Sequence, residues 1–152
     1  MPETVPPLFR RAVLAVSGGP GDRTIVRLAC ELARPHKAEL TVVHVVEIDW
    51  TLPLDADVAS RSEEAQRVLD LADELAEEMH YFVEPVLLQA RDVGAALVDE
   101  ATERGADLLI LSLPYRKRFG GDFALGRTVP YVFKNAPCMV WVIREPMPEE
   151  KP

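Results

Sequence analysis

Short apolar runs alternate with segments of helical period along this chain, and that alternation restricts its fold more than any other feature. Five runs are short and mostly rich in β-branched residues, which is typical of buried strands. They span residues 11–17, 39–46, 82–89, 107–112 and 138–143. Strands that are apolar on both faces and separated by helices specify a parallel sheet covered by helices on both sides. The sequence therefore predicts an α/β fold, a three-layer αβα sandwich.

Local signals refine some of these elements. The clearest helix carries its apolar stripe on residues 65–79, and Ser60 and Glu63 precede it in a capping-box pattern. Pro85 cannot donate a hydrogen bond to a neighbouring strand, so the strand that contains it is expected at an edge of the sheet. The last helix is expected to begin near residues 126–128. It should bury three apolar residues, which are Val129, Val132 and Phe133.

Length and composition narrow the class of protein. The chain has 152 residues, which fits a single domain over residues 1–152 with an ordered core of about 9–145. Its net charge of −8 argues against nucleic-acid binding, which requires a cationic face. No apolar run reaches the ~18 residues of a membrane span, and no signal-peptide pattern is visible. Cys30 and Cys138 are expected as buried thiols, and no metal-ligand spacing is present. We therefore expect a cytoplasmic protein with no membrane insertion.

Two loops differ from ordinary connectors. Ser17–Asp22 is rich in glycine, and Leu113–Thr128 is long, basic and contains glycine. In open parallel sheets, ligands bind outside the carboxyl ends of the strands where the strand order reverses. We therefore expect a ligand site where these two loops meet. The chain has no Walker motif and no signature that pairs a nucleophile with a base, so no catalytic residue is predicted.

Several segments resemble the universal stress protein family over nearly the whole chain. They read RAVLAVSGG from residue 11, AELTVVHVV from residue 38, GADLLIL from residue 105 and LGRTVPYVFKNAPCMVWVIRE from residue 125. The resemblance implies an open five-stranded parallel sheet of order 3-2-1-4-5. This is a Rossmann-like arrangement of the adenine nucleotide alpha hydrolase type, with its switch point between the first and fourth strands.

The resemblance also implies a homodimer, because many members of the family pair through the last strand. The candidate interface residues are Met139, Val140, Trp141, Val142 and Ile143. Both faces of this strand are apolar, and a large Trp on an edge strand suits an interface. In the alternative interpretation, the termini or the last helix cover the strand within one chain.

Some members of the family bind ATP through an acidic residue after strand one and a set of glycines after strand four. Five positions of that pattern are changed or shifted here. They are Ser17, Leu113, Arg116, Arg127 and Thr128. Gly126 alone remains of the glycine set, and a side chain there is expected to crowd a ligand or the start of the helix. The motif therefore favours a member that does not bind ATP in the usual way.

The charge of the second loop favours an anionic ligand. Arg116, Lys117 and Arg118 lie together, and Arg127 stands beside a helix N-terminus, where a cation is unfavourable unless an anion neutralises it. Arginine binds phosphate through two parallel hydrogen bonds. One interpretation is an altered site for ATP or another adenine nucleotide, with Mg²⁺, or for another small anion. The other is a solvated loop whose arginines pair with acids such as Asp122.

The remaining candidates lie at the same edge of the sheet. Gly18 and Gly19 would form the turn of the first loop, and Val45 falls where the family's second strand contacts adenine, although a strand valine also suits the core. His44 is expected to be a hydrogen-bonded core residue rather than a base. Asp22 and Asp49 are candidates for binding a metal–nucleotide, and the alternative is that they are solvated surface acids.

Two functions stay open on these grounds. The first is a small stress-response regulator that binds an adenine nucleotide or another anion at the switch point. The second is a protein-interaction module without a ligand, which would regulate a transporter or an enzyme. A slow ATPase has less support, because no general base is identifiable.

Overall fold

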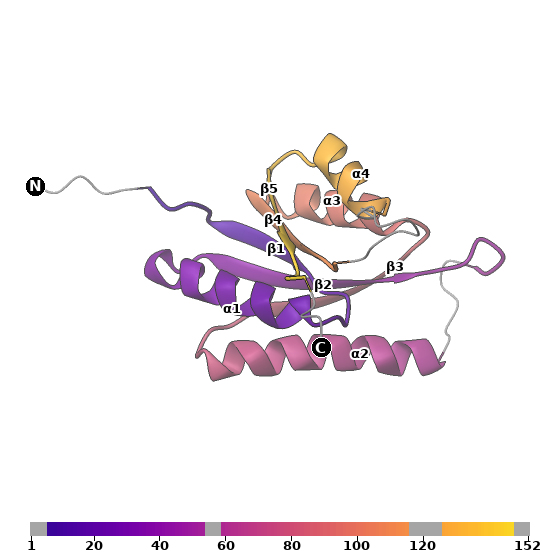
Figure 1. The fold of residues 1–152 in the computed structure, drawn as a ribbon, viewed down its shortest axis with the longest axis horizontal. Coiled ribbons are helices and arrows are strands. Elements are labelled where there is room, and N and C mark those ends of the chain that lie inside the picture. Colours follow the sequence, from indigo (N-terminus) through magenta and orange to yellow (C-terminus); the bar gives the residue numbers. More distant parts are fainter. Residues whose placement is uncertain (1–5, 54–58, 116–125, 148–152) are drawn as a thin grey trace, which may run out of the picture.

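Five parallel strands form one sheet of order β3-β2-β1-β4-β5, as the alternation of apolar runs and the family resemblance predict (Figure 1). The computed structural model describes residues 6–53, 59–115 and 126–147. The strands are β1 (Arg11–Ala15), β2 (Glu39–Glu47), β3 (Glu84–Ala90), β4 (Leu108–Leu113) and β5 (Met139–Arg144). The helices are α1 (Gly21–Ala33), α2 (Ala59–Glu78), α3 (Val93–Glu103) and α4 (Thr128–Asn135), with a short 3₁₀ turn at Arg34–His36.

Helices cover both faces of the sheet. Figure 1 shows α1 and α2 on one side and α3 and α4 on the other. The core is divided in the same way, because Leu14 of β1 packs in the cluster with α1 and α2, while its neighbour Val13 packs in the cluster with α3. Both side chains are fully buried. Neighbouring residues of a strand point to opposite faces, so β1 must be apolar on both.

The strand order reverses between β1 and β4. β1 is central and pairs in parallel with β2 on one side and with β4 on the other. The chain therefore runs outward from β1 to β3 and then returns to β4 across the middle of the sheet. β3 lies at an edge, which confirms the expectation drawn from Pro85. Among the described residues, no helix is long and apolar enough to cross a membrane.

Several local predictions were wrong. Pairing of β3 with β2 begins at Glu84, so Phe82 precedes the strand and is exposed. Helix α2 begins at Ala59, so Ser60 lies within its first turn rather than before it. Phe133 is exposed because it is rotated about 100° around α4 from Val132, which packs on the sheet. The Cys138 thiol is only half buried, since β5 is an edge strand.

Candidate functional site

A cavity of about 400 Å³ opens at the carboxyl ends of β1 and β4, where the strand order reverses. Its lining comes from the ends of β1, β2 and β4 and from the first residues of α3 and α4. Six residues singled out from the sequence lie in this lining: Ser17, Val45, Leu113, Gly126, Arg127 and Thr128. Gly18 and Gly19 are not part of the lining, and Arg116 lies outside the described residues.

The walls of this cavity are mostly aliphatic, with a few polar groups. Apolar side chains come from the strands and from α3 and α4, for example Val43 of β2, Leu97 of α3 and Leu111 of β4. Polar groups come from serine, threonine and histidine residues of the lining, and the ring Nδ1 of His44 lies 2.8 Å from the Val16 carbonyl oxygen. His44 is therefore hydrogen-bonded, as expected. Apolar walls with a small number of polar groups are typical of a site for a small molecule.

The turn between β1 and α1 is held by an acid that the sequence interpretation placed in solvent. The Asp22 side chain is only 5% exposed. Its two carboxylate oxygens accept hydrogen bonds from the backbone N–H of Ser17 at 3.0 Å and of Gly18 at 2.8 Å. Burial raises the pKa of Asp22, while these two N–H groups and the nearby His44 oppose the rise. A solvated role for Asp22 is therefore wrong, because the turn folds back onto its carboxylate.

A second acid reaches the same turn from the far end of the chain. The backbone N–H of Gly21 donates to Glu145 Oε1 at 3.2 Å. A Cβ atom on Gly21 would lie 2.7 Å from the Cβ of Ser112 and 3.0 Å from Glu145 Oε1, so this close approach requires glycine. Amides that resemble a phosphate-binding turn in sequence are thus bound by carboxylates of the protein itself. Gly21 and Glu145 are 124 positions apart in the chain, which explains why no local sequence pattern revealed this contact.

The N-terminus of α4 forms one side of the cavity mouth. Gly126 precedes it with φ +69°, a conformation that favours glycine. A Cβ atom there would meet nothing within 4 Å among the described residues, so the expected crowding of the helix start is wrong and backbone conformation is the reason for this glycine. Pro130, the third residue of α4, has no N–H, which removes one of the donors that a helix start usually offers.

Arg127 pairs with an acid at the end of β2. Its Nη2 atom forms an ion pair and hydrogen bond with Oε1 of Glu47, the last residue of β2. The two side chains are 74% and 48% exposed. The sequence interpretation foresaw pairing with an acid but named Asp122, which lies outside the described residues. Glu47 was missed, because 80 residues separate it from Arg127.

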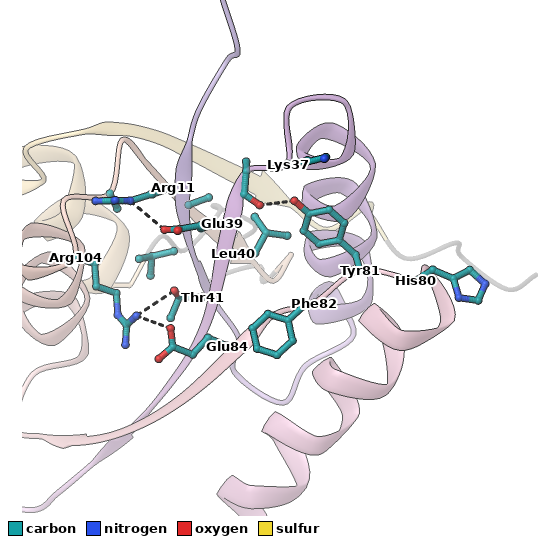
Figure 2. A pocket seen from close by; sticks show the side chains of 14 residues that line it. Arg11, Lys37, Glu39, Leu40, Thr41, His80, Tyr81, Phe82, Glu84 and Arg104 are labelled. Carbon is teal, nitrogen blue, oxygen red and sulfur yellow. Dashed lines mark hydrogen bonds and ion pairs between the residues drawn. The ribbon is translucent and has the colours of Figure 1, made fainter.

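A larger hollow, of about 680 Å³, lies at the opposite end of the strands (Figure 2). Four of its charged side chains form two ion pairs. Arg11 Nε lies 3.0 Å from Glu39 Oε2, and Arg104 Nη1 lies 2.9 Å from Glu84 Oε2. Figure 2 shows the Arg104 guanidinium directed at Thr41 and Glu84, and the His80 ring directed away from the other labelled side chains. The cavity at the switch point is therefore the better candidate for a ligand.

The predicted interface strand, β5, is partly covered within the chain. The Trp141 ring packs edge-on against the Phe9 ring, with centroids 5.9 Å apart, and residues 140–143 are half buried. At Trp141, a residue of the N-terminal segment therefore covers the strand, as the alternative interpretation expected. The backbone edge of β5 is different, because β4 is its only strand partner among the described residues. Pairing of two copies through that edge stays a prediction.

Comparisons with known proteins agree with this architecture. A family model described as the universal stress protein family matches residues 8–144. The sensor protein KdpD of Mycobacterium tuberculosis is 36% identical over 116 residues, which are 76% of this chain but only 12% of that protein.

Two solved structures of universal stress proteins from Archaeoglobus fulgidus have the same fold. One has a TM-score of 0.72 and 23% identity, and the alignment covers 90% of this chain and 99% of that one. The other is a complex with dAMP, with a TM-score of 0.70 and 20% identity, covering 90% and 98% of the two chains.

Proposed function

The chain belongs to the universal stress protein family, and on that premise we propose that it is a small regulatory protein that binds an adenine nucleotide or another small anionic ligand. The binding site is the cavity between the carboxyl ends of β1 and β4. One observation carries the proposal: this cavity, of about 400 Å³, has aliphatic walls and an arginine at its mouth. A base or another flat apolar group would occupy the walls, and an anionic group would lie near Arg127.

Two relatives support the two halves of the proposal. The Archaeoglobus fulgidus protein of the same fold binds dAMP in its solved structure, which favours a nucleotide as the ligand. The similarity to part of a bacterial sensor protein favours a regulatory role. A nucleoside monophosphate would use both the aliphatic walls and the cation.

Titration calorimetry with ATP, ADP, AMP and cyclic AMP tests this proposal, supported by the thermal shift of the protein with each ligand. The site is tested with Ala15→Leu, which places extra methyl groups in the cavity. Ala106→Leu is the matched control, because it makes the same change in the lining of the larger hollow at the other end of the sheet. We expect Ala15→Leu to weaken binding at least tenfold, about 1.4 kcal/mol, and Ala106→Leu to leave it unchanged.

The outcomes separate two functions. If none of the four ligands gives heat or a thermal shift at millimolar concentration, the nucleotide proposal fails and a ligand-free interaction module is favoured. The occupation of the β1–α1 amides by Asp22 and Glu145 is the observation that supports this second function. If Ala106→Leu alone weakens binding, the ligand lies in the larger hollow instead.

We also propose that the protein acts as a homodimer that pairs through β5. The support is the unpartnered backbone edge of β5 among the described residues and the apolar side chains along it.

A further inference from the structure

We propose that Glu47 sets the charge selectivity of the cavity, because its carboxylate competes with the ligand's anionic group for the Arg127 guanidinium. The site then prefers a ligand with one phosphate over one with two or three. This inference rests on the proposed function and names the ligand class of the same site.

The first step concerns the donors that the site offers to an anion. On the β1–α1 turn, the amides of Ser17, Gly18 and Gly21 already donate to Asp22 and Glu145. At the start of α4, Pro130 offers no N–H. Within the described lining of the cavity, Arg127 therefore supplies the cation on which a phosphate would depend. The N–H groups of Thr128 and Val129 remain at the start of α4, so Arg127 contributes positive charge rather than every hydrogen bond to the anion. A change in the pairing of Arg127 should therefore change how strongly an anion binds.

The second step concerns which of the internal carboxylates a ligand can displace. Asp22 is buried and holds two backbone N–H groups, so removing it would open the turn. The Glu47–Arg127 pair is different, because both side chains are substantially exposed. Ion pairs of this kind contribute little to stability, so a phosphate can replace Glu47 on the guanidinium at small cost.

The third step concerns where the displaced carboxylate remains. Glu47 is the last residue of β2, and Val45, two residues earlier, lines the cavity. Residues two apart in a strand point to the same face of the sheet, and Glu47 contacts Arg127 of the cavity lining, so its carboxylate lies next to the cavity. Its charge therefore stays beside the ligand and repels each further negative charge on it. Affinity should fall from AMP to ADP to ATP, whereas uncharged adenosine should be insensitive to Glu47.

The experiment compares wild-type protein, Glu47→Gln and Glu39→Gln by titration with adenosine, AMP, ADP and ATP at one salt concentration. Glu39→Gln is the matched control, because it removes the same charge and also breaks an exposed ion pair with an arginine, Arg11, at the opposite end of the sheet. For Glu47→Gln we expect adenosine affinity to change less than twofold, AMP affinity to rise about twofold to threefold and ATP affinity about fivefold, in line with the energies of exposed charge pairs. Glu39→Gln should leave the order of affinities unchanged.

The possible failures are distinguishable. If wild-type protein binds none of these ligands, adenosine included, the proposed binding of an adenine nucleotide itself fails. If it binds AMP but Glu47→Gln leaves the ratio of AMP to ATP affinity as in wild type, the function stands and the role of Glu47 is overturned. The same holds if Glu39→Gln shifts that ratio equally, since the effect would then come from net charge. Arg127→Gln completes a double-mutant cycle. If the gain from Glu47→Gln persists undiminished without Arg127, competition for the guanidinium is disproved.

Discussion

At the scale of single residues, the Asp22 carboxylate decides what the β1–α1 turn can bind. It stands in the first turn of α1, where a negative charge is favoured by the helix dipole. Both of its oxygens accept backbone N–H groups of the turn, including that of Gly18 at φ +90°. A glycine-rich turn that would suit phosphate in sequence is therefore closed by the protein's own anion. The residue types of the turn alone would predict a bound phosphate in place of the Asp22 carboxylate.

Asp22→Asn tests this arrangement through stability. Asparagine has one acceptor oxygen, so one of the two N–H groups loses its partner, and we expect the free energy of unfolding to fall by about 1–3 kcal/mol at neutral pH.

The contribution of Asp22 to the free energy of unfolding should also depend on pH. Burial raises the pKa of Asp22 above its ordinary value of 3.8, so the folded protein keeps this proton at pH values where the unfolded chain has lost it. The contribution of Asp22 to stability must then decrease as pH rises above about 3.8, until the folded-state pKa is passed.

Urea unfolding of wild type and Asp22→Asn across this pH range gives the measurement. The difference between their free energies of unfolding isolates Asp22 from the other acids. It should decline with rising pH and then become constant. A difference that grows with pH would contradict the raised pKa.

At the scale of elements, the N-terminus of α1 lies against β4 and against the segment that follows β5. Gly21 is the first residue of α1, and a Cβ on it would overlap Ser112 of β4 and approach Glu145, which follows β5. The helix start thus ties the end of β1 to the two strands on the other side of the switch point. A tight contact here positions one wall of the candidate site.

Gly21→Ala should lower the free energy of unfolding by about 1–3 kcal/mol, the usual cost of overpacking, because Ser112 is on a central strand and cannot move away. Gly94→Ala is the matched control, since Gly94 is also in the first turn of a helix. Its Cβ would lie 3.0 Å from Tyr131 Cδ1 and 3.2 Å from Tyr131 Cβ, which is a looser contact than the 2.7 Å at Ser112, so we expect a smaller loss of stability. Thermal or urea unfolding of both variants measures the difference. Equal destabilisation would show that helix glycine itself, rather than the α1–β4 contact, is responsible.

The elements also show how far the sequence predicts this molecule. The five strands and their order follow from apolar periodicity and the resemblance, because both faces of the central strands must be buried. The location of the cavity follows as well, since carboxyl ends of parallel strands meet at one edge. What failed depends on tertiary contacts. Phe133 is exposed because the face of α4 that packs on the sheet carries Val132 and not its neighbour. The acids that bind Gly21 and Arg127 lie 124 and 80 positions away in the chain.

At the scale of the whole molecule, the two edges of the sheet are unlike. The β3 edge begins with Glu84 and Pro85, a charge and a residue without an N–H, which discourage pairing with another strand. The β5 edge has neither between Met139 and Ile143. An apolar edge strand of this kind is a template for further strand pairing unless something covers it. A second copy of the chain, pairing β5 with β5, would cover both edges at once.

This dimer predicts opposite results for the same substitution at the two edges. Met139 on β5 and Leu87 on β3 are 43% and 39% exposed, so a lysine at either position should be tolerated by the folded monomer. Met139→Lys should raise the dimer dissociation constant at least tenfold, about 1.4 kcal/mol, because two ammonium groups would lie in one symmetric interface. Leu87→Lys should leave it unchanged. Sedimentation equilibrium over a range of protein concentrations measures both constants. If wild type is a monomer throughout, or if Leu87→Lys alone dissociates the dimer, pairing through β5 is wrong. The apolar edge would then require another cover.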